Sequence, residues 1–309
     1  MQSNKMKLRM AIRAAGTAAV LSIFSQPALA QSTAEVQAKL DDMQRQIDQM
    51  VSNQSSGGWV IPGTDTAMTI SGYVKLDMIA DFDQDMDDML FEPGFKTGNE
   101  KGDTSFRAHA RQSRLRIGTS TPTDVGTAKT TIEADFFGGG GNEILSNSRG
   151  LRIRHAYGEL NGLLAGQTWS NFMHFTAYPA TVELGGPVGV SFIRQAQLRY
   201  TMPVGDGAAF SVSAENPEAT GFEGSRDVFP DLTAKYKWSG STGGIEIAGL
   251  ARSLQTDDAS ATGDDNAFGY GVMAAGRLNL TDATTVKAGV IFGDGVGRYI
   301  CLLYTSDAA

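Results

Sequence analysis

The most regular feature of the chain is an alternation of apolar and polar residues that runs from Met68 to Gly293. In its first segment, the apolar side chains of Ile70, Val74 and Leu76 are separated by polar or small ones. A period of two predicts β-strands that have one apolar and one polar face. We expect about eleven strands, at residues 68–80, 115–117, 130–136, 151–157, 164–169, 196–202, 210–214, 232–238, 245–247, 268–280 and 286–292.

The connections between these strands alternate between long and short. Long connections cover residues 82–105, 138–149, 171–193, 216–228 and 255–266, and short ones cover 121–124, 161–162, 203–207, 240–244 and 281–283. Antiparallel strands joined alternately by long outer loops and tight periplasmic turns are typical of an outer-membrane barrel. The sequence therefore predicts an all-β transmembrane antiparallel β-barrel over residues 67–297. The alternative is a secreted β-sandwich or β-helix, but a sandwich does not require every second turn to be short.

The first thirty residues have a different pattern. A basic start is followed by an apolar stretch over 14–24 and by Ala28-Leu29-Ala30, the small-x-small pattern that a signal peptidase cleaves. These features predict a secretory signal peptide at residues 1–30. A membrane anchor is the alternative, but the apolar segment is too short for one and Pro27 follows it.

A short helical pattern follows at residues 31–51, where five apolar residues have the spacing of a coiled-coil seam. The five residues are Val36, Leu40, Met43, Ile47 and Met50. Because an isolated helix of this length is marginal in water, it needs a partner. We expect a homo-oligomeric coiled coil in the periplasm, and the alternative is a helix that packs on its own domain. Residues 52–66, rich in Ser and Gly at the start, form the expected linker.

If the apolar faces meet lipid, the charged residues between them line a lumen. Two strands carry pairs of arginines at successive inward positions, Arg114 with Arg116 and Arg152 with Arg154. Guanidinium groups bind carboxylates bidentately, so such a lumen favours anions. The alternative is that these arginines pair with Glu133 and Asp135 and brace the wall, and both can hold together. Further inward basic residues are Lys75, Lys129, Arg199, Lys235, Lys237, Arg277 and Lys287, and further inward acids are Asp77, Asp81 and Glu246.

Two long loops are rich in charge and one is rich in apolar residues. The aspartates at 83–88 and a second group at 257–265 have a spacing that could bind calcium, but the run that begins at Asp83 lacks Gly and Glu at the required offsets and resembles a solvated loop more. The loop at 171–193 is too apolar for a free surface loop. It either folds into the lumen as a constriction or packs against a neighbouring subunit.

Composition and charge exclude several functions. The formal net charge is -8. Removal of residues 1–30 takes four of the 26 basic residues and leaves 22 against 34 acids, a net charge of -12, which argues against nucleic acid as a partner. The single Cys301 excludes a disulfide framework and a cysteine-based zinc site. His155 is in phase with Leu151 and Ile153 and is expected on the lipid side. We expect no enzyme, no catalytic residue, no metal and no cofactor.

Several motifs carry a resemblance to a known family. Ile70-Ser71-Gly72-Tyr73, Arg111-Gln112-Ser113-Arg114, the segment 151–159, Gln167-Thr168-Trp169 and Gly185-Gly186-Pro187 before Arg194-Gln195 resemble the DcaP-like porins. The resemblance implies a homotrimer in outer-membrane lipid and lipopolysaccharide, with sixteen strands of which this chain holds about eleven. It implies an anion pathway on Arg114, Arg116, Arg152 and Arg154, with Arg194 and Arg199 beside it.

The expected function is thus a passive channel for small hydrophilic solutes, with a preference for anions such as dicarboxylates or aromatic acids. The alternative is a structural outer-membrane protein that tethers the envelope through its coiled coil. At the other end, the alternation stops, and residues 301–306 read like a sequencing adaptor. We expect residues 298–309 to be a non-native tail, reached where a reading frame runs off an incomplete assembly.

Overall fold

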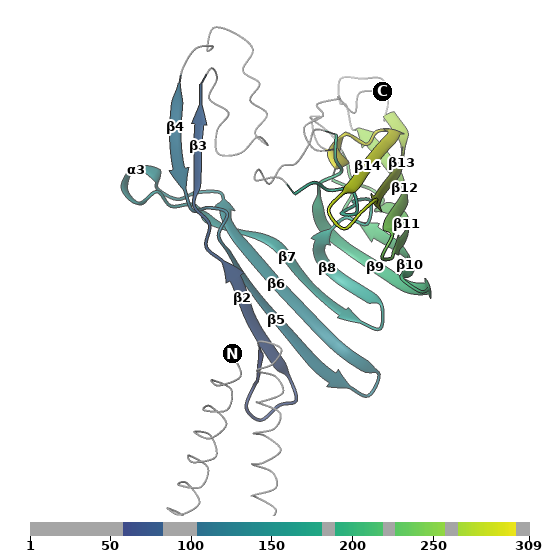
Figure 1. The fold of residues 1–309 in the computed structure, drawn as a ribbon, viewed down its shortest axis with the longest axis horizontal. Coiled ribbons are helices and arrows are strands. Elements are labelled where there is room, and N and C mark those ends of the chain that lie inside the picture. The colour runs from purple at the N-terminus through teal and green to yellow at the C-terminus, as the bar shows by residue number, and fades with distance from the viewer. Residues whose placement is uncertain (1–57, 83–103, 181–188, 219–225, 257–264, 301–309) are drawn as a thin grey trace, which may run out of the picture. The chain divides into compact units, whose positions relative to one another are not determined.

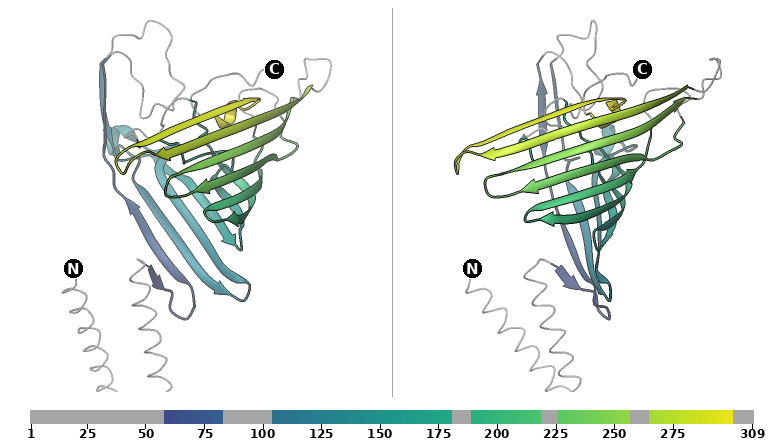
Figure 2. Two further views of the ribbon diagram at one scale, coloured as in Figure 1. Left: turned by 45° about the vertical axis from the view of Figure 1, so that its right-hand side comes forward. Right: turned by 90° about the vertical axis from the view of Figure 1, so that its right-hand side faces the viewer.

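A computed structural model describes residues 58–82, 104–180, 189–218, 226–256 and 265–300, which all belong to one compact unit, Ser55–Ala309. In these residues, twelve antiparallel strands form one sheet in the order β1-β2-β5-β6-β7-β8-β9-β10-β11-β12-β13-β14, and β3 pairs with β4 (Figures 1 and 2). The strands are β1 (Gly58–Val60), β2 (Ala67–Tyr73), β3 (Asp77–Asp81), β4 (Ser105–His109), β5 (Arg114–Thr123), β6 (Gly126–Gly138), β7 (Gly150–Leu160), β8 (Leu163–Trp169), β9 (Arg194–Gly205), β10 (Ala208–Glu215), β11 (Asp231–Ser239), β12 (Gly243–Thr256), β13 (Asp265–Asn279) and β14 (Thr285–Asp294). Helix α3 (Glu143–Ser146) lies between β6 and β7, and the 3-10 helix η1 (Gly297–Tyr299) follows β14.

The two faces of the large sheet have the reverse of the burial seen in a soluble protein. On β6, the polar side chains of Thr131, Glu133 and Asp135 are buried, whereas Ile132 between them is 55% exposed. The same inversion recurs on β9, where Gln195 and Gln197 are buried and Leu198 is exposed. Since soluble proteins rarely expose continuous apolar surface, the apolar face has the character of a surface that meets lipid. No helix among the described residues is long and apolar enough to cross a membrane.

A pair of substitutions on β9 tests which face meets lipid. Leu198→Arg puts a charge on the exposed apolar face and should destabilise the folded protein in lipid by about 2–4 kcal/mol near the bilayer midplane. Thr201→Arg, three residues along on the polar face, should cost far less because its charge reaches water. Urea unfolding in lipid vesicles measures both, and equal losses for the two variants would contradict the assignment of the faces.

The strand predicted at 68–80 is wrong as a continuous element, because the structure divides it into β2 and β3. Gly72 adopts a positive φ of 149°, and a side chain there would collide with the Arg114 carbonyl. Beyond Tyr73, the Lys75 amide donates to the Ser113 hydroxyl at 3.0 Å instead of to a strand carbonyl. The chain then pairs β3 with β4 in a separate sheet, and β4 begins at Ser105, the last residue of the predicted long loop.

The predicted short connections are present. Between β7 and β8, Asn161 and Gly162 both have positive φ, 50° and 83°, as a two-residue hairpin turn requires. The Asn161 side-chain amide also donates to the Val125 carbonyl of the neighbouring turn. These contacts join the β7–β8 turn to the neighbouring β5–β6 turn.

Several predictions concern residues that are not described. They are the signal peptide at 1–30, the coiled coil at 31–51 with Val36, Leu40, Met43, Ile47 and Met50, residues 52–57 of the linker, the acidic run at 83–88, residues 257–264 of the second acidic run, and residues 301–309 of the tail. The rest of the predicted linker, residues 58–66, is described and begins with strand β1, so the linker prediction is wrong there. Residues 298–300 are described and do pack. Tyr299 is fully buried and donates to the Asp231 carboxylate at 2.7 Å, and Ile300 pairs with Ser191. We therefore group residues 298–300 with the sheet.

Candidate functional site

Two buried carboxylates hold two of the predicted arginines on the polar face. Arg152 donates to both oxygens of Asp135, from Nε at 3.0 Å and from Nη2 at 2.8 Å. Arg154 bridges the two acids, with Nε to Glu133 at 2.8 Å and Nη1 to Asp135 at 3.0 Å. Because β6 and β7 are hydrogen-bonded neighbours, these contacts cross-link the wall. Arg152 and Arg154 therefore match the alternative in which the arginines pair with Glu133 and Asp135 and brace the wall.

The other guanidinium groups nearby are much less compensated. Arg114 Nη1 lies 3.8 Å and Arg116 Nη1 lies 4.0 Å from the Glu133 carboxylate, beyond hydrogen-bond distance. Arg194 stacks over the Trp169 ring, with Cζ 4.4 Å from the ring centroid. Buried nitrogens of both Arg114 (Nε and Nη2) and Arg194 (Nη1) have no hydrogen-bond partner among the described residues.

These five residues, Arg114, Arg116, Arg152, Arg154 and Arg194, form what we call the arginine cluster. Arg194 is within electrostatic range of Arg114, Arg152 and Arg154, so the cluster is continuous across β5, β7 and β9. Four of the five guanidinium groups lie within 4.0 Å of the two carboxylates of Glu133 and Asp135, and the fifth, Arg194, lies against Trp169. The cluster therefore carries an excess of three positive charges. Because a buried N–H without a partner is costly, its free donors suit an anionic ligand.

The expected lipid-side position of His155 is wrong. The pairing of β6 with β7 shifts between Glu133 and Ala134, where β7 carries one extra residue. Beyond this bulge the phase of β7 is reversed, so His155 pairs with Glu133 in register and its Nδ1 lies 2.9 Å from the Thr168 hydroxyl. Both partners are buried on the polar face, and His155 therefore belongs beside the arginine cluster.

An aromatic group adjoins Arg194. The Trp169 ring lies 4.7 Å from Phe192 and 5.6 Å from Phe175 between centroids, and Tyr178 stacks on Phe192 at 6.0 Å. Trp169 also contacts His155 edge to face at 5.8 Å. The guanidinium of Arg194 thus lies against an aromatic surface, which combines a positive charge with a stacking platform.

The remaining predicted pore residues lie apart from this cluster. Lys75 is in the connection between β2 and β3 and pairs with Asp77 at 2.6 Å. Lys129 lies opposite Glu159 in register, near the short turns. Arg199 Nη1 approaches the Trp169 carbonyl at 3.5 Å. Lys75 and Lys129 add no uncompensated donor to those of Arg114 and Arg194, whereas the buried Nε of Arg199 has no hydrogen-bond partner among the described residues and does add one.

The apolar loop at 171–193 lies against the polar face in its described parts. Phe172 is fully buried in an apolar cluster with Ala248, Leu250 and Met273. The Ser170 amide donates to the Ile193 carbonyl at 3.0 Å, which closes the base of the loop. The two predicted alternatives were that the loop folds into the lumen or packs against a neighbouring subunit. The described residues of the loop fit the first.

Residues 51–307 match the model of a protein family whose description is "Porin subfamily". The chain belongs to this porin subfamily. The resemblance to DcaP-like porins is confirmed, since the porin superposes on the outer membrane channel DcaP of Acinetobacter baumannii with a TM-score of 0.66 and 25% identity. The superposition covers 80% of this chain and 68% of that one.

Curated relatives of this porin include porin Omp2b of Brucella canis, 28% identical, and porin Omp2b of Brucella abortus, 27% identical. Each match extends over 206 residues, or 62% of this chain and 52% of the relative. The chain thus spans about half the length of the curated relatives it matches. The family and the DcaP likeness support an outer-membrane location for this porin.

The porin also has a buried polar network that the sequence did not reveal. Arg252 donates to Asp231 at 3.0 Å, Tyr299 donates to the same carboxylate, and Gln195 connects Tyr299 at 2.9 Å to Glu215 at 2.6 Å. All five side chains are buried. The alternation of apolar and polar residues could have placed Gln195, Glu215 and Arg252 on the polar face. It could not have predicted that Tyr299, which follows the last strand, packs against the same face.

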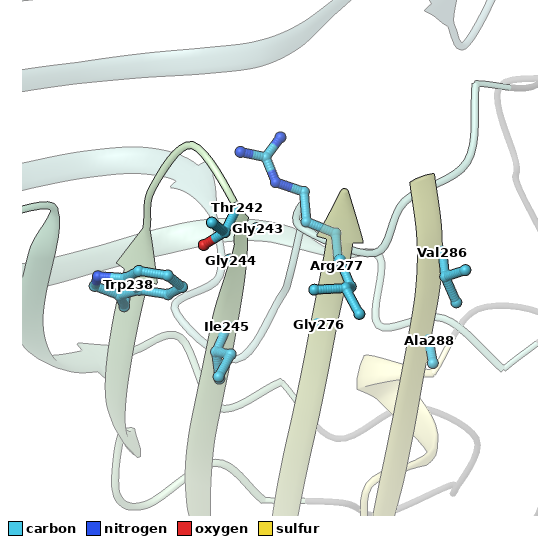
Figure 3. A pocket seen from close by; sticks show the side chains of 10 residues that line it. Trp238, Thr242, Gly243, Gly244, Ile245, Gly276, Arg277, Val286 and Ala288 are labelled. Carbon is cyan, nitrogen blue, oxygen red and sulfur yellow. The ribbon is translucent and has the colours of Figure 1, made fainter. Parts of the chain in front are cut away.

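The opposite, apolar face of the porin has a pocket of about 380 Å³ at the turn ends of β11 to β14 (Figure 3). Trp238, Ile245 and Val286 line it, and the small residues Gly276 and Ala288 leave the space. Ile245, Gly276 and Ala288 are aligned in register across three strands. Most of the lining belongs to the apolar face, although Arg277 also contributes to it, and no residue of the arginine cluster does, so the pocket is separate from that cluster.

Proposed function

We propose that this porin is a passive outer-membrane diffusion channel for small hydrophilic solutes, with a preference for anions such as dicarboxylates or aromatic acids. The observation that carries the proposal is the excess of guanidinium groups on the polar face, with unpartnered donors on Arg114 and Arg194. The carboxylates that hold Arg152 and Arg154 make no hydrogen bond with Arg114, which lies 3.8 Å from Glu133, and none with Arg194 among the described residues.

The chemistry of the cluster supports an organic anion as the preferred solute. A carboxylate can accept two parallel hydrogen bonds from one guanidinium, and a dicarboxylate can engage two such groups at once. The aromatic group at Trp169, Phe175, Phe192 and Tyr178 adds a stacking surface beside Arg194. An aromatic acid would therefore find both its charge and its ring complemented at one place on the wall.

We further propose that the protein is a homotrimer whose N-terminal coiled coil lies in the periplasm and whose barrel of sixteen strands is embedded in outer-membrane lipid and lipopolysaccharide. The heptad seam at 36–50 and the DcaP likeness support this assembly. The apolar exposed face supports contact with lipid.

Measurement of the reversal potential in a planar bilayer tests the proposed function. The full-length gene product is inserted between two unequal KCl solutions, and an anion-preferring channel should give a potential of the sign set by chloride. Addition of a dicarboxylate to one side should reduce the chloride current by competition. A protein that inserts without opening a channel would instead favour the tethering role, and a cation-preferring channel would contradict the anion preference alone.

A further inference from the structure

A buried carboxylate on β12 holds the inward loop by its backbone. Glu246 is 1% exposed, and its Oε1 accepts from the amides of Phe175 at 3.3 Å and Thr176 at 3.2 Å. The same oxygen accepts from the Thr176 hydroxyl at 2.5 Å. Oε2 pairs with Lys235 at 3.4 Å. One side chain of the wall thus fixes two successive residues of the loop.

Two neighbouring contacts hold the preceding residues of the loop. Lys235 Nζ donates to the Met173 carbonyl at 3.1 Å. Glu215 on β10 accepts from the Asn171 amide at 2.8 Å. The wall therefore supplies a cation for a loop carbonyl and carboxylates for loop amides. Because buried backbone groups must be satisfied, these side chains take the place of a strand partner.

The surface of the wall is also shaped to fit the loop. A side chain added at Gly271 on β13 would lie 2.9 Å from Phe172 Cζ, and one at Gly289 on β14 would lie 3.1 Å from His174 Nε2. Both glycines therefore leave the space that Phe172 and His174 occupy. The polar contacts and the shape of the wall agree on one position for the loop.

We propose that Glu246 is the positioning residue that holds the first part of this loop, residues 171–176, against the polar face, so that its attachment affects the size of solute that passes. The inference rests on the proposed channel function for its consequence, but the position of the loop can be measured without any current. Glu246→Gln should weaken the attachment, because an amide presents a donor to Lys235 and loses the charge that strengthens the loop contacts.

Cysteine accessibility is the direct test. In a cysteine-free background of the full-length gene product, Met173→Cys reports on the loop, since Met173 is buried against the wall. Its reaction with a charged methanethiosulfonate reagent in detergent should be about tenfold faster when Glu246→Gln is added, from the usual strength of a charge-assisted hydrogen bond. Thr176→Val, which changes only the loop, should act in the same direction.

Two controls separate loop release from general loosening. Leu164→Cys, buried on β8 and outside the apolar cluster around Phe172, should react at an unchanged rate. Glu159→Gln removes a carboxylate from β7 without touching the loop contacts described above and should leave Met173→Cys protected. Unchanged protection of Met173→Cys in both Glu246→Gln and Thr176→Val would overturn the inference. Equal acceleration at Leu164→Cys would also overturn it, because the whole wall would have loosened.

Single-channel recording then links the loop to permeation. Polyethylene glycols that are small enough to enter a channel reduce its conductance. The largest polymer size that has this effect should increase in Glu246→Gln and stay the same in Glu159→Gln. If Met173→Cys reacts faster in Glu246→Gln but the polymer cut-off is unchanged, the proposed effect of the loop on solute size is wrong. If the protein forms no channel, the proposed function is wrong. The cysteine-accessibility result still decides whether Glu246 holds the loop.

Discussion

Arg154→Ala is expected to destabilise the folded porin by about 3–5 kcal/mol, the usual cost of leaving buried charges unpaired. The Arg154 side chain is 3% exposed and is hydrogen-bonded to both Glu133 and Asp135. Asp135 keeps Arg152 after the substitution, but Glu133 keeps only the longer contacts to Arg114 and Arg116. The carboxylate of Glu133 would thus remain on the wall without a hydrogen-bonded cation.

Urea unfolding in lipid, followed by tryptophan fluorescence, measures this loss. The matched control is Arg116→Ala, which also removes one guanidinium of the arginine cluster. Its side chain is 48% exposed and 4.0 Å from Glu133, so the expected cost is below about 1 kcal/mol. Adding Glu133→Gln to Arg154→Ala should recover part of the stability. Similar costs for Arg154→Ala and Arg116→Ala would mean that Arg154 does not brace the wall.

The faces of the strands could be predicted because a period of two assigns every residue to one side. Ile132 and Leu198 lie on the exposed face, and Glu133 and Asp135 on the buried one, as their phase predicts. The alternation of apolar and polar residues does not show where a strand stops pairing with its neighbour. The break after Tyr73 depends on the backbone of Gly72, and the reversal at His155 depends on a bulge, which no periodicity displays.

The sequence also could not predict which arginines of the cluster are paired with carboxylates and which keep unpartnered donors, and the reason is a different one. Arg152 and Arg154 form one of the two arginine pairs at successive inward positions, yet each is held by a carboxylate of β6. Which arginine meets which acid depends on the register of β6 and β7, and that register shifts. Arg194 stands at the first position of β9, where phase is undefined, and only the family resemblance pointed to it.

Composition predicted that the loop at 171–193 is covered, either in the lumen or against a neighbouring subunit, but it predicted neither the choice between the two nor the attachment of the loop. Phe172 and Val190 are buried, as apolar residues in a loop must be if water is to be avoided. Glu246 and Lys235 are inward by phase, but nothing in the sequence connects them with Thr176 or Met173, some sixty to seventy residues earlier. Such contacts arise only when the sheet brings β11 and β12 under the loop.

The double substitution Arg114→Gln with Arg194→Gln is expected to remove most of the anion preference while the protein still folds. Both side chains contribute positive charge without a hydrogen-bonded carboxylate, so their loss leaves three guanidinium groups facing two acids. The excess charge of the cluster falls from three to one. Because a lumen concentrates ions by the field of its wall, the anion-to-cation permeability ratio should fall by a factor of about ten.

The reversal potential in a KCl gradient measures this ratio. The matched control, Lys129→Gln with Arg277→Gln, removes two positive charges from the polar face away from the cluster and should change the ratio much less. An equal drop in both variants would mean that the total charge of the wall sets selectivity, and no drop in either would contradict the assigned role of Arg114 and Arg194. Since Arg152 and Arg154 remain paired in the double variant, the wall keeps its cross-links, and a lost preference then reflects lost charge instead of lost structure.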